Sequence, residues 1–110
     1  MSQIPTVTTS DVANDAIILD VREPDEWAAG HAPGAVHIPL GDLQARVNEL
    51  SGLGTGSVAV ACRGGGRSSR AVDWLTQQGY DVANLDGGMK AWQAAGKPMV
   101  ADGDAAPDVR

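Results

Sequence analysis

The chain has 110 residues, the size of one ordinary domain, and two separate cores within this length would each be too small to fold stably. Its content of 43% hydrophobic and 20% charged residues is typical of a globular protein rather than a disordered or fibrous one. Fourteen acidic residues against eight basic ones leave a net charge of -6, which argues against a general binder of nucleic acids or anionic membranes.

The chain contains one cysteine, Cys62, so an internal disulfide is excluded. A four-ligand zinc site built on Cys62, His31 and His37 would have to recruit carboxylates, and we expect neither a metal nor an organic cofactor. The first residues show no basic region followed by an apolar stretch, and the longest apolar runs are far shorter than a membrane span. With the free thiol, these features predict a cytoplasmic protein that is monomeric by default.

Short apolar runs rich in Val, Ile and Leu alternate with helical patterns along the chain. The predicted strands cover residues 16–19, 35–38, 58–61 and 82–85, with a poorer one near 6–8. The runs are continuous rather than alternating, which is typical of parallel strands covered by helices on both faces. The predicted helices cover residues 24–29, 40–50, 68–79 and 89–96.

This alternation predicts a three-layer α/β domain over residues 1–98. From residue 99 onward the apolar content thins, while aspartate, glycine and proline accumulate. The composition therefore predicts a flexible C-terminal tail over residues 99–110.

The segment that follows the predicted strand 58–61 is the most informative part of the sequence. Cys62 ends the strand, three glycines follow, and a helix begins near Ser68, which is where open parallel sheets bind ligands. The run Gly64–Gly66 lets successive main-chain N–H groups turn inward and form a concave nest that favours an anion. The helix start, Arg63 and Arg67 add positive charge at the same place.

Such surroundings stabilise the thiolate of Cys62 over the thiol, and the thiolate is the species that attacks electrophiles. We therefore hypothesise a nucleophilic cysteine. Plainer interpretations exist, because a lone cysteine after an apolar run can be a small buried hydrophobe, glycines can form a flexible turn, and Arg70 can pair with Asp73. Each is reasonable alone, but together they do not explain why a strand, a thiol, a nest and two guanidinium groups coincide.

In these features the sequence resembles the rhodanese family of sulfurtransferases, in particular its short single-domain members. The resemblance extends from about Val7 to Pro98 and rests on four motifs, which are residues 19–24 (LDVREP), residues 30–35 (GHAPGA), the loop Cys62 to Ser68, and residues 85–88 (LDGG) with Trp92. It implies a five-stranded, mostly parallel sheet with helices on both faces. It also implies a persulfide on Cys62, surrounded by the main-chain N–H groups of Arg63, Gly64, Gly65, Gly66, Arg67 and Ser68.

The resemblance implies transfer of a sulfane sulfur from thiosulfate or a persulfide donor to cyanide or a thiol. The expected partners are therefore a small anionic donor and a thiol acceptor, with a sulfur-relay protein as a further candidate. Two alternatives stay open, namely a sulfur carrier or interaction module without turnover, and an anion hydrolase or reductase. Related phosphatases and arsenate reductases place five residues between nucleophile and arginine, whereas four separate Cys62 from Arg67. The shorter loop favours a single sulfur atom over a tetrahedral oxyanion.

Further polar residues near this edge of the predicted sheet receive supporting roles. Asp20 and Arg22 end a strand on the same edge as the thiol, and we interpret them as an ion pair that supports the pocket. Arg63 and Arg67 are candidates for attracting the dianionic donor, although Arg67 is equally a candidate for bracing the loop from behind. His31 lies in a turn set by glycines and a proline, and the resemblance implies an architectural role for it rather than that of a general base.

Two residues outside this edge are interpreted as structural. His37 lies in a strand run and is predicted to be a packing or surface residue. Asp86 precedes two glycines and the helix of Trp92, and it is predicted to cap that helix.

Overall fold

The computed structural model describes residues 4–53 and 56–110. Within these residues five strands form one sheet in the order β1-β5-β4-β2-β3, and every pairing between neighbours is parallel. The strands are β1 Thr6–Val7, β2 Ile18–Asp20, β3 Ala35–His37, β4 Val58–Ala61 and β5 Val82–Leu85. All five lie within or next to the predicted apolar runs, and the sheet is fully parallel.

Four α-helices and three 3₁₀ turns in the described residues connect the strands. They are η1 Thr9–Asp11, α1 Pro24–Ala29, η2 Leu40–Asp42, α2 Leu43–Arg46, η3 Val47–Gly52, α3 Gly66–Gln77 and α4 Gly88–Ala94. The prediction of one continuous α-helix over residues 40–50 is wrong, since η2, α2 and η3 follow one another there. Gly41, Asp42 and Asn48 favour the α-helix weakly, and the Ser51 hydroxyl donates to the Asn48 carbonyl at 2.8 Å.

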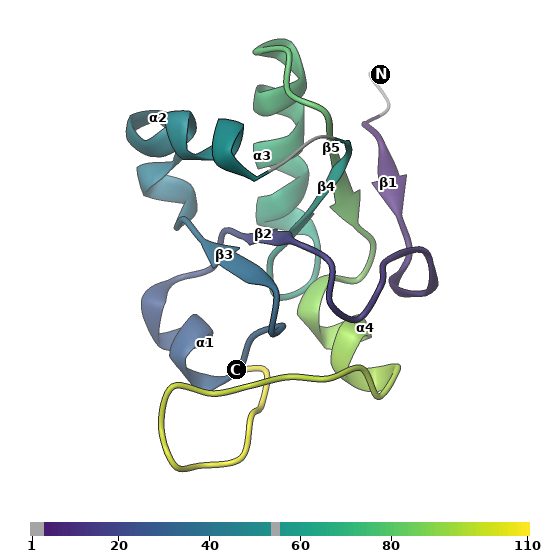
Figure 1. The fold of residues 1–110 in the computed structure, drawn as a ribbon, viewed down its shortest axis with the longest axis vertical. Coiled ribbons are helices and arrows are strands. Elements are labelled where there is room, and N and C mark those ends of the chain that lie inside the picture. Colours follow the sequence, from purple (N-terminus) through teal and green to yellow (C-terminus); the bar gives the residue numbers. More distant parts are fainter. Residues whose placement is uncertain (1–3, 54–55) are drawn as a thin grey trace.

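Each face of the sheet carries its own apolar core, which confirms the predicted three-layer α/β architecture. Figure 1 shows α2 and α3 on one side of the sheet and α4 on the other. The first core joins strand residues to α2, η3 and α3, and its buried members include Leu19, Val60, Val82, Leu43, Leu50, Val72 and Leu75. The second core joins the opposite strand faces to α4, and its buried members include Ile18, Ala59, Leu85, Met89 and Trp92.

Residues 99–110 run back across the lower end of the molecule and lie against α1 (Figure 1). Val100 pairs with His31 in an antiparallel bridge, and the Asp108 N–H donates to the Ala29 carbonyl at 2.9 Å. The composition of this segment predicts a flexible tail. These contacts indicate that the segment packs against the domain. Its flexibility in solution stays a prediction.

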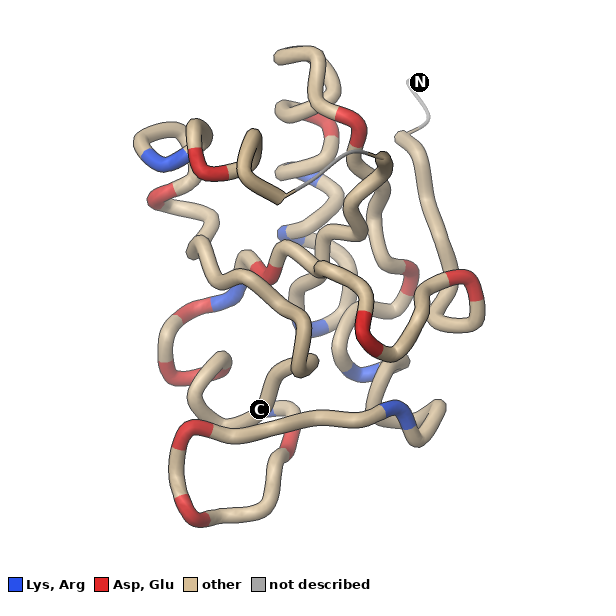
Figure 2. The backbone as a smooth tube through the Cα atoms, viewed as in Figure 1, with Lys and Arg blue, Asp and Glu red and all other residues tan. Residues whose placement is uncertain are grey.

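The surface of the molecule is predominantly acidic. Figure 2 shows acidic positions spread over the outer turns, in keeping with the net charge of -6. Within residues 4–53 and 56–110, no helix has both the length and the apolar character needed to cross a lipid bilayer.

Candidate active site

Cys62 follows β4 directly, at the carboxyl edge of the sheet, and its side chain is buried, with the residue 1% exposed. The next three residues form a tight loop before α3 begins at Gly66. Gly65 has a φ of 112°, a left-handed conformation that L side chains rarely adopt, and it precedes the helix as its N-cap. In this conformation the Gly65 N–H points back at the sulfur and donates to Cys62 Sγ at 3.0 Å.

Several hydrogen bonds converge on the sulfur from the start of α3. The Ser68 hydroxyl lies 3.3 Å from Cys62 Sγ, and the main-chain N–H groups of Ser68, Gly65 and Arg67 also donate to it. Burial alone raises the pKa of the Cys62 thiol, but these hydrogen bonds outweigh it and hold the pKa below its ordinary value. The site therefore favours the nucleophilic thiolate. Donation by the other predicted amides, those of Arg63, Gly64 and Gly66, stays a prediction.

The outer side of the loop is held by the start of α4. The N–H groups of Met89 and Lys90 donate to the carbonyls of Cys62 and Arg63 at 2.8 and 3.0 Å. Gly88 lies so close to the loop that an added Cβ would sit 2.5 Å from the Cys62 carbonyl oxygen. Because α4 binds the carbonyls of Cys62 and Arg63 on the outer side of the loop, the main-chain N–H groups that follow can face the sulfur on the inner side.

The predicted capping of α4 by Asp86 is wrong. Gly87 is the N-cap of this helix and makes no side-chain capping bond, while Asp86 is exposed. The main-chain N–H of Asp86 instead donates to the Val7 carbonyl at 2.8 Å and extends the β1–β5 pairing. The contact between α4 and the Cys62 loop was not predicted, although two consecutive glycines before a helix are a signal of close backbone approach.

Arg67, on the first turn of α3, is bound by Glu26 of α1. Its two terminal nitrogens lie 2.6 and 2.8 Å from the two Glu26 carboxylate oxygens. The hydrogen bond with Arg67 holds the pKa of Glu26 at about 2 and raises the pKa of Arg67. Of the two roles predicted for Arg67, this geometry favours bracing, since the pair ties α3 and the thiol loop to α1.

Arg63 is exposed on the loop and contacts the C-terminal segment. Its Nε donates to the main-chain oxygen of Arg110 at 2.8 Å. Gly64 and Gly66 are also exposed, which leaves the outer rim of the loop open to solvent. The attraction of an anionic donor by Arg63 stays a prediction.

Asp20 and Arg22 form a fully buried ion pair just beyond β2. The Arg22 Nη2 lies 2.7 Å from the Asp20 carboxylate, and its Nε lies 2.9 Å from the other carboxylate oxygen. The same Nη2 donates to the Gly30 carbonyl at 2.7 Å. The expected ion pair is therefore present and joins the end of β2 to the turn after α1, while its support of the pocket stays a prediction.

His31 and His37 both stack on the indole of Trp27. The ring centroids lie 3.6 and 4.8 Å from that of Trp27, and both pairs are nearly parallel. His31 Nδ1 lies 2.8 Å from the Trp27 carbonyl, and His37 Nε2 lies 2.8 Å from the Arg22 carbonyl. Both imidazoles are thus engaged in packing and backbone contacts, consistent with structural roles.

Asn84, in the middle of β5, belongs to the site but was not predicted from the sequence. Its side chain is buried behind the loop, and its Oδ1 lies 2.5 Å from the Ser68 hydroxyl. A signal was present, because Asn84 is a polar residue inside an otherwise apolar strand run. Such a residue must find hydrogen-bond partners when it is buried, and here it finds them at the thiol loop.

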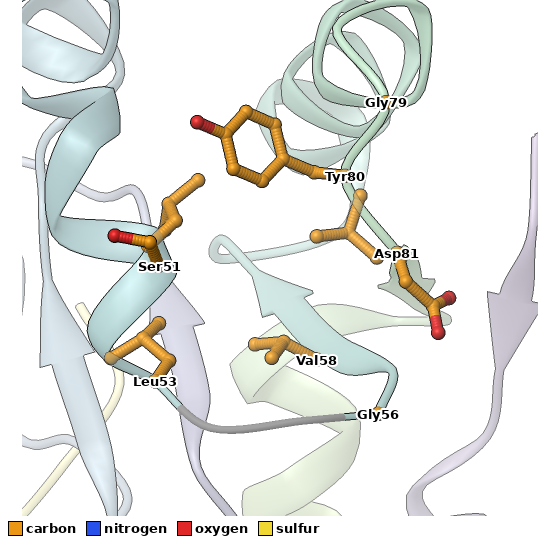
Figure 3. Close-up of a pocket in the computed structure, with 9 residues that line it drawn as sticks. Ser51, Leu53, Gly56, Val58, Gly79, Tyr80 and Asp81 are labelled. Carbon is orange, nitrogen blue, oxygen red and sulfur yellow. The ribbon is translucent and has the colours of Figure 1, made fainter.

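A cavity of about 220 Å³ lies at the opposite edge of the sheet, where β4 and β5 begin. Figure 3 shows Leu53, Val58 and Tyr80 around it. Its described lining contains none of the predicted site residues. Two further cavities, of about 200 and 230 Å³, likewise have no Cys62 in their lining. Cavity volume therefore does not locate the site, and we place it where the donors converge on the sulfur.

Comparisons with known proteins identify the family and the fold of the chain. The family model of the rhodanese-like domain matches residues 8–95. A rhodanese-related protein from Thermoplasma volcanium is 30% identical, with a TM-score of 0.74 over 87% of this chain and 97% of that one. A thiosulfate sulfurtransferase from Pseudomonas aeruginosa is 30% identical, with a TM-score of 0.78 over 91% of this chain and 21% of that one.

A further neighbour carries a different description. A Rhodopseudomonas palustris protein of unknown function, described as a possible tyrosine phosphatase, is 30% identical with a TM-score of 0.73, over 88% of this chain and 85% of that one. The shared architecture thus occurs among proteins with more than one suggested chemistry. The family match nevertheless spans most of the sequence, from η1 to the end of α4, and the chain belongs to the rhodanese-like domain family.

Proposed function

We propose that the protein is a sulfurtransferase that moves a sulfane sulfur from thiosulfate or a persulfide donor to a thiophilic acceptor through a persulfide on Cys62. The observation that carries the proposal is the buried thiol with main-chain N–H groups aimed at its sulfur. The similarity to a thiosulfate sulfurtransferase supports the same chemistry.

In the first half of the proposed reaction, the Cys62 thiolate attacks the outer sulfur of thiosulfate. A new S–S bond forms to Cys62 as the S–S bond of thiosulfate breaks, and its electron pair leaves with sulfite. The negative charge then resides on the outer sulfur of the persulfide. Main-chain donors around the loop stabilise this charge as it develops, and they need no reorganisation because the fold already holds them.

In the second half, a nucleophile such as cyanide or a thiolate attacks the outer sulfur. The persulfide S–S bond breaks, its electron pair returns to Cys62 as the thiolate, and the acceptor leaves as thiocyanate or as a new persulfide. The hydrogen bonds that lower the pKa of the Cys62 thiol favour the thiolate as the attacking species in the first half, and the second half regenerates it. Ping-pong kinetics are expected.

The dimensions of the loop favour sulfur over phosphate or arsenate. Four residues lie between Cys62 and Arg67, and the guanidinium of Arg67 is bound in a bidentate pair by Glu26. An arginine that served a tetrahedral oxyanion would need its donors directed at the oxygens of that group. Here they are directed at a carboxylate of α1.

Intact-mass spectrometry after incubation with thiosulfate tests the proposal. The wild-type protein should gain the mass of one sulfur atom and lose it when cyanide is added. The Cys62→Ser variant should gain nothing and show no thiocyanate production. Sulfur loading or full activity in that variant would overturn the assignment.

Two further measurements separate the proposal from its alternatives. Steady production of thiocyanate over many turnovers supports a transferase, whereas loading without turnover is the behaviour of a sulfur carrier. Hydrolysis of p-nitrophenyl phosphate that depends on Cys62, without sulfur loading, would replace the proposal with phosphoryl chemistry.

A further inference from the structure

The Ser68 hydroxyl has one proton and three acceptors around it. Asn84 Oδ1 lies at 2.5 Å, the Gly65 carbonyl oxygen at 3.2 Å and Cys62 Sγ at 3.3 Å. Ser68 itself is fully buried, so water does not supply a further partner from bulk solvent. The hydroxyl can donate to only one of these acceptors at a time.

The neighbouring Ser69 occupies one of the three acceptors, the Gly65 carbonyl oxygen. Its main-chain N–H and its hydroxyl both donate to the Gly65 carbonyl, at 3.0 and 2.6 Å, which satisfies both lone pairs of that oxygen. The Ser68 proton is therefore shared between the amide of Asn84 and the sulfur of Cys62.

Ser69 also sets the orientation of the Asn84 amide. Because the Ser69 proton is given to Gly65, the Ser69 oxygen can accept a bond from Asn84 Nδ2, which lies 3.1 Å away. That bond places the carbonyl oxygen of the amide toward Ser68. The backbone of Asn84 is held in turn, since β5 pairs with β1 and β4 and the Asn84 N–H donates to the Pro5 carbonyl at 2.8 Å.

We propose that Asn84 is a positioning residue that competes with the Cys62 sulfur for the Ser68 proton and thereby sets how strongly Ser68 stabilises the thiolate. The proposal deepens the proposed function, since it concerns the same thiol. Asn84 does not contact the sulfur and acts through Ser68.

The competition has a different outcome in each state of the thiol. A thiolate is a charged acceptor and draws the Ser68 proton away from Asn84, because charge-assisted hydrogen bonds are the stronger ones. In a persulfide the charge has moved to the outer sulfur, so the inner sulfur accepts weakly and the proton returns to Asn84. The Asn84 amide therefore accepts the Ser68 proton in the persulfide state, in which the inner sulfur is a weak acceptor.

The charged groups near the loop are paired with one another and do not take over this role of Asn84. The charge of Arg67 on α3 is balanced by Glu26 of α1, and Asp20 and Arg22 form their own buried pair beside β4. Asn84 and Ser68 are uncharged, so their exchange of one proton changes the hydrogen bonding of the sulfur without changing these pairs.

The test is the pH profile of alkylation by iodoacetamide, followed by intact mass. Cys62 is the chain's one cysteine, so the profile reports this thiol alone, and the slow access that burial imposes applies equally to every variant. Asn84→Leu releases the Ser68 proton to the sulfur, and we expect the midpoint of the profile to fall by about half a pH unit, the size of one modest hydrogen bond.

Ser68→Ala provides the matched comparison. Alone it should raise the midpoint, because the sulfur loses a donor. In the Ser68→Ala background, Asn84→Leu should leave the midpoint unchanged, since the residue through which it acts is absent. A purely structural role for Asn84 predicts the same shift in both backgrounds, and that result, or a rise of the midpoint in Asn84→Leu, overturns the proposal.

Asn84→Asp keeps the proposal testable if the leucine variant does not fold. A carboxylate holds the Ser68 proton more tightly and adds negative charge, so the midpoint should rise, and the rise should be smaller without Ser68. An equal rise in both backgrounds contradicts the proposal. Alkylation does not require sulfur transfer, so a protein that never loads sulfur can still show the Asn84 effect, and a working transferase can lack it.

Discussion

The two edges of the sheet are built from the same strands and carry different chemistry. At the carboxyl edge, the residues after β4 and β5 lead into the first turns of α3 and α4, whose N–H groups contact the Cys62 loop. At the amino edge, the same two strands begin beside an apolar cavity of about 220 Å³, lined by Leu53, Val58 and Tyr80 among others (Figure 3). The carboxyl edge therefore gathers main-chain N–H donors around the thiol loop, whereas the amino edge borders a cavity.

The difference teaches that strand direction is a better guide to a site than volume in a small parallel sheet. Every parallel strand that leads into a helix delivers unpaired N–H groups to its carboxyl end, and those groups favour anions. The amino edge receives helix C-termini and turns, such as the one at Gly79. A cavity there can exist without any group that would activate a thiol or bind a negative charge.

Outside Cys62 itself, the largest expected effect comes from Gly88→Ala, which alters the contact between α4 and the Cys62 loop at the carboxyl edge. The new Cβ would meet the Cys62 carbonyl at 2.5 Å, in a residue whose φ is 58°, so the loop must move. We expect the rate of sulfur loading from thiosulfate to fall on the order of tenfold to a hundredfold, as small displacements of reacting groups do.

Gly96→Ala is the matched control for that change. Gly96 has a φ of 72°, but nothing lies within 4 Å of an added Cβ. The control carries the cost of a left-handed alanine, about 1 kcal/mol, without the collision. Equal rates of sulfur loading in Gly88→Ala and Gly96→Ala would show that the contact between α4 and the Cys62 loop does not affect the site.

A smaller effect is expected from Glu26→Gln, which loosens the brace between α1 and α3. The partner Arg67 is partly exposed, so we expect a loss on the order of 1 kcal/mol of unfolding free energy at pH 7. The pKa of Glu26 is lowered to about 2, so its contribution is complete above its ordinary pKa of 4.5 and is lost as the pH falls toward 2. Urea titrations should show the wild type and the variant converging over that range. A difference that persists unchanged at pH 2 would contradict the assignment.

The smallest effect on the site is expected from Leu53→Ala at the amino edge. Leu53 is half-buried, so its truncation should cost about 1 kcal/mol of stability, less than a fully buried leucine would. The loading rate and the midpoint of the alkylation profile should stay at their wild-type values. A change in either would show that the two edges are coupled and would weaken the contrast between them.

The strands and the thiol loop could be predicted because their signals are local. Short runs rich in apolar residues mark β4 and β5, and the three glycines after Arg63 mark a turn that exposes main-chain donors. The family resemblance then implied the five-stranded sheet, and the persulfide that it also implies stays a prediction. These features depend on residues that are neighbours in the chain.

The brace and the outer support of the loop depend on contacts between distant residues. Glu26 and Arg67 are 41 positions apart, and neither residue type indicates its partner. The fit of Gly88 against the Cys62 carbonyl depends on how α4 docks, which no pattern within residues 85–92 determines. The helix predicted over residues 40–50 failed for a different reason, because its apolar spacing was right while weak helix formers interrupted its backbone.

The contact between Arg63 and Arg110 has a practical consequence for handling the protein. Arg110 lies beside the Cys62 loop, where its main-chain oxygen accepts a hydrogen bond from Arg63 at 2.8 Å, whereas Figure 1 shows β1 beginning at the other end of the molecule. A purification handle is therefore better placed before β1. Conversely, a short flexible linker appended after Arg110 and ending in a peptide thiol would bring that thiol to the proposed persulfide at an effective concentration of about a millimolar. Such a fusion offers a direct way to rank acceptor peptides without adding any of them to solution.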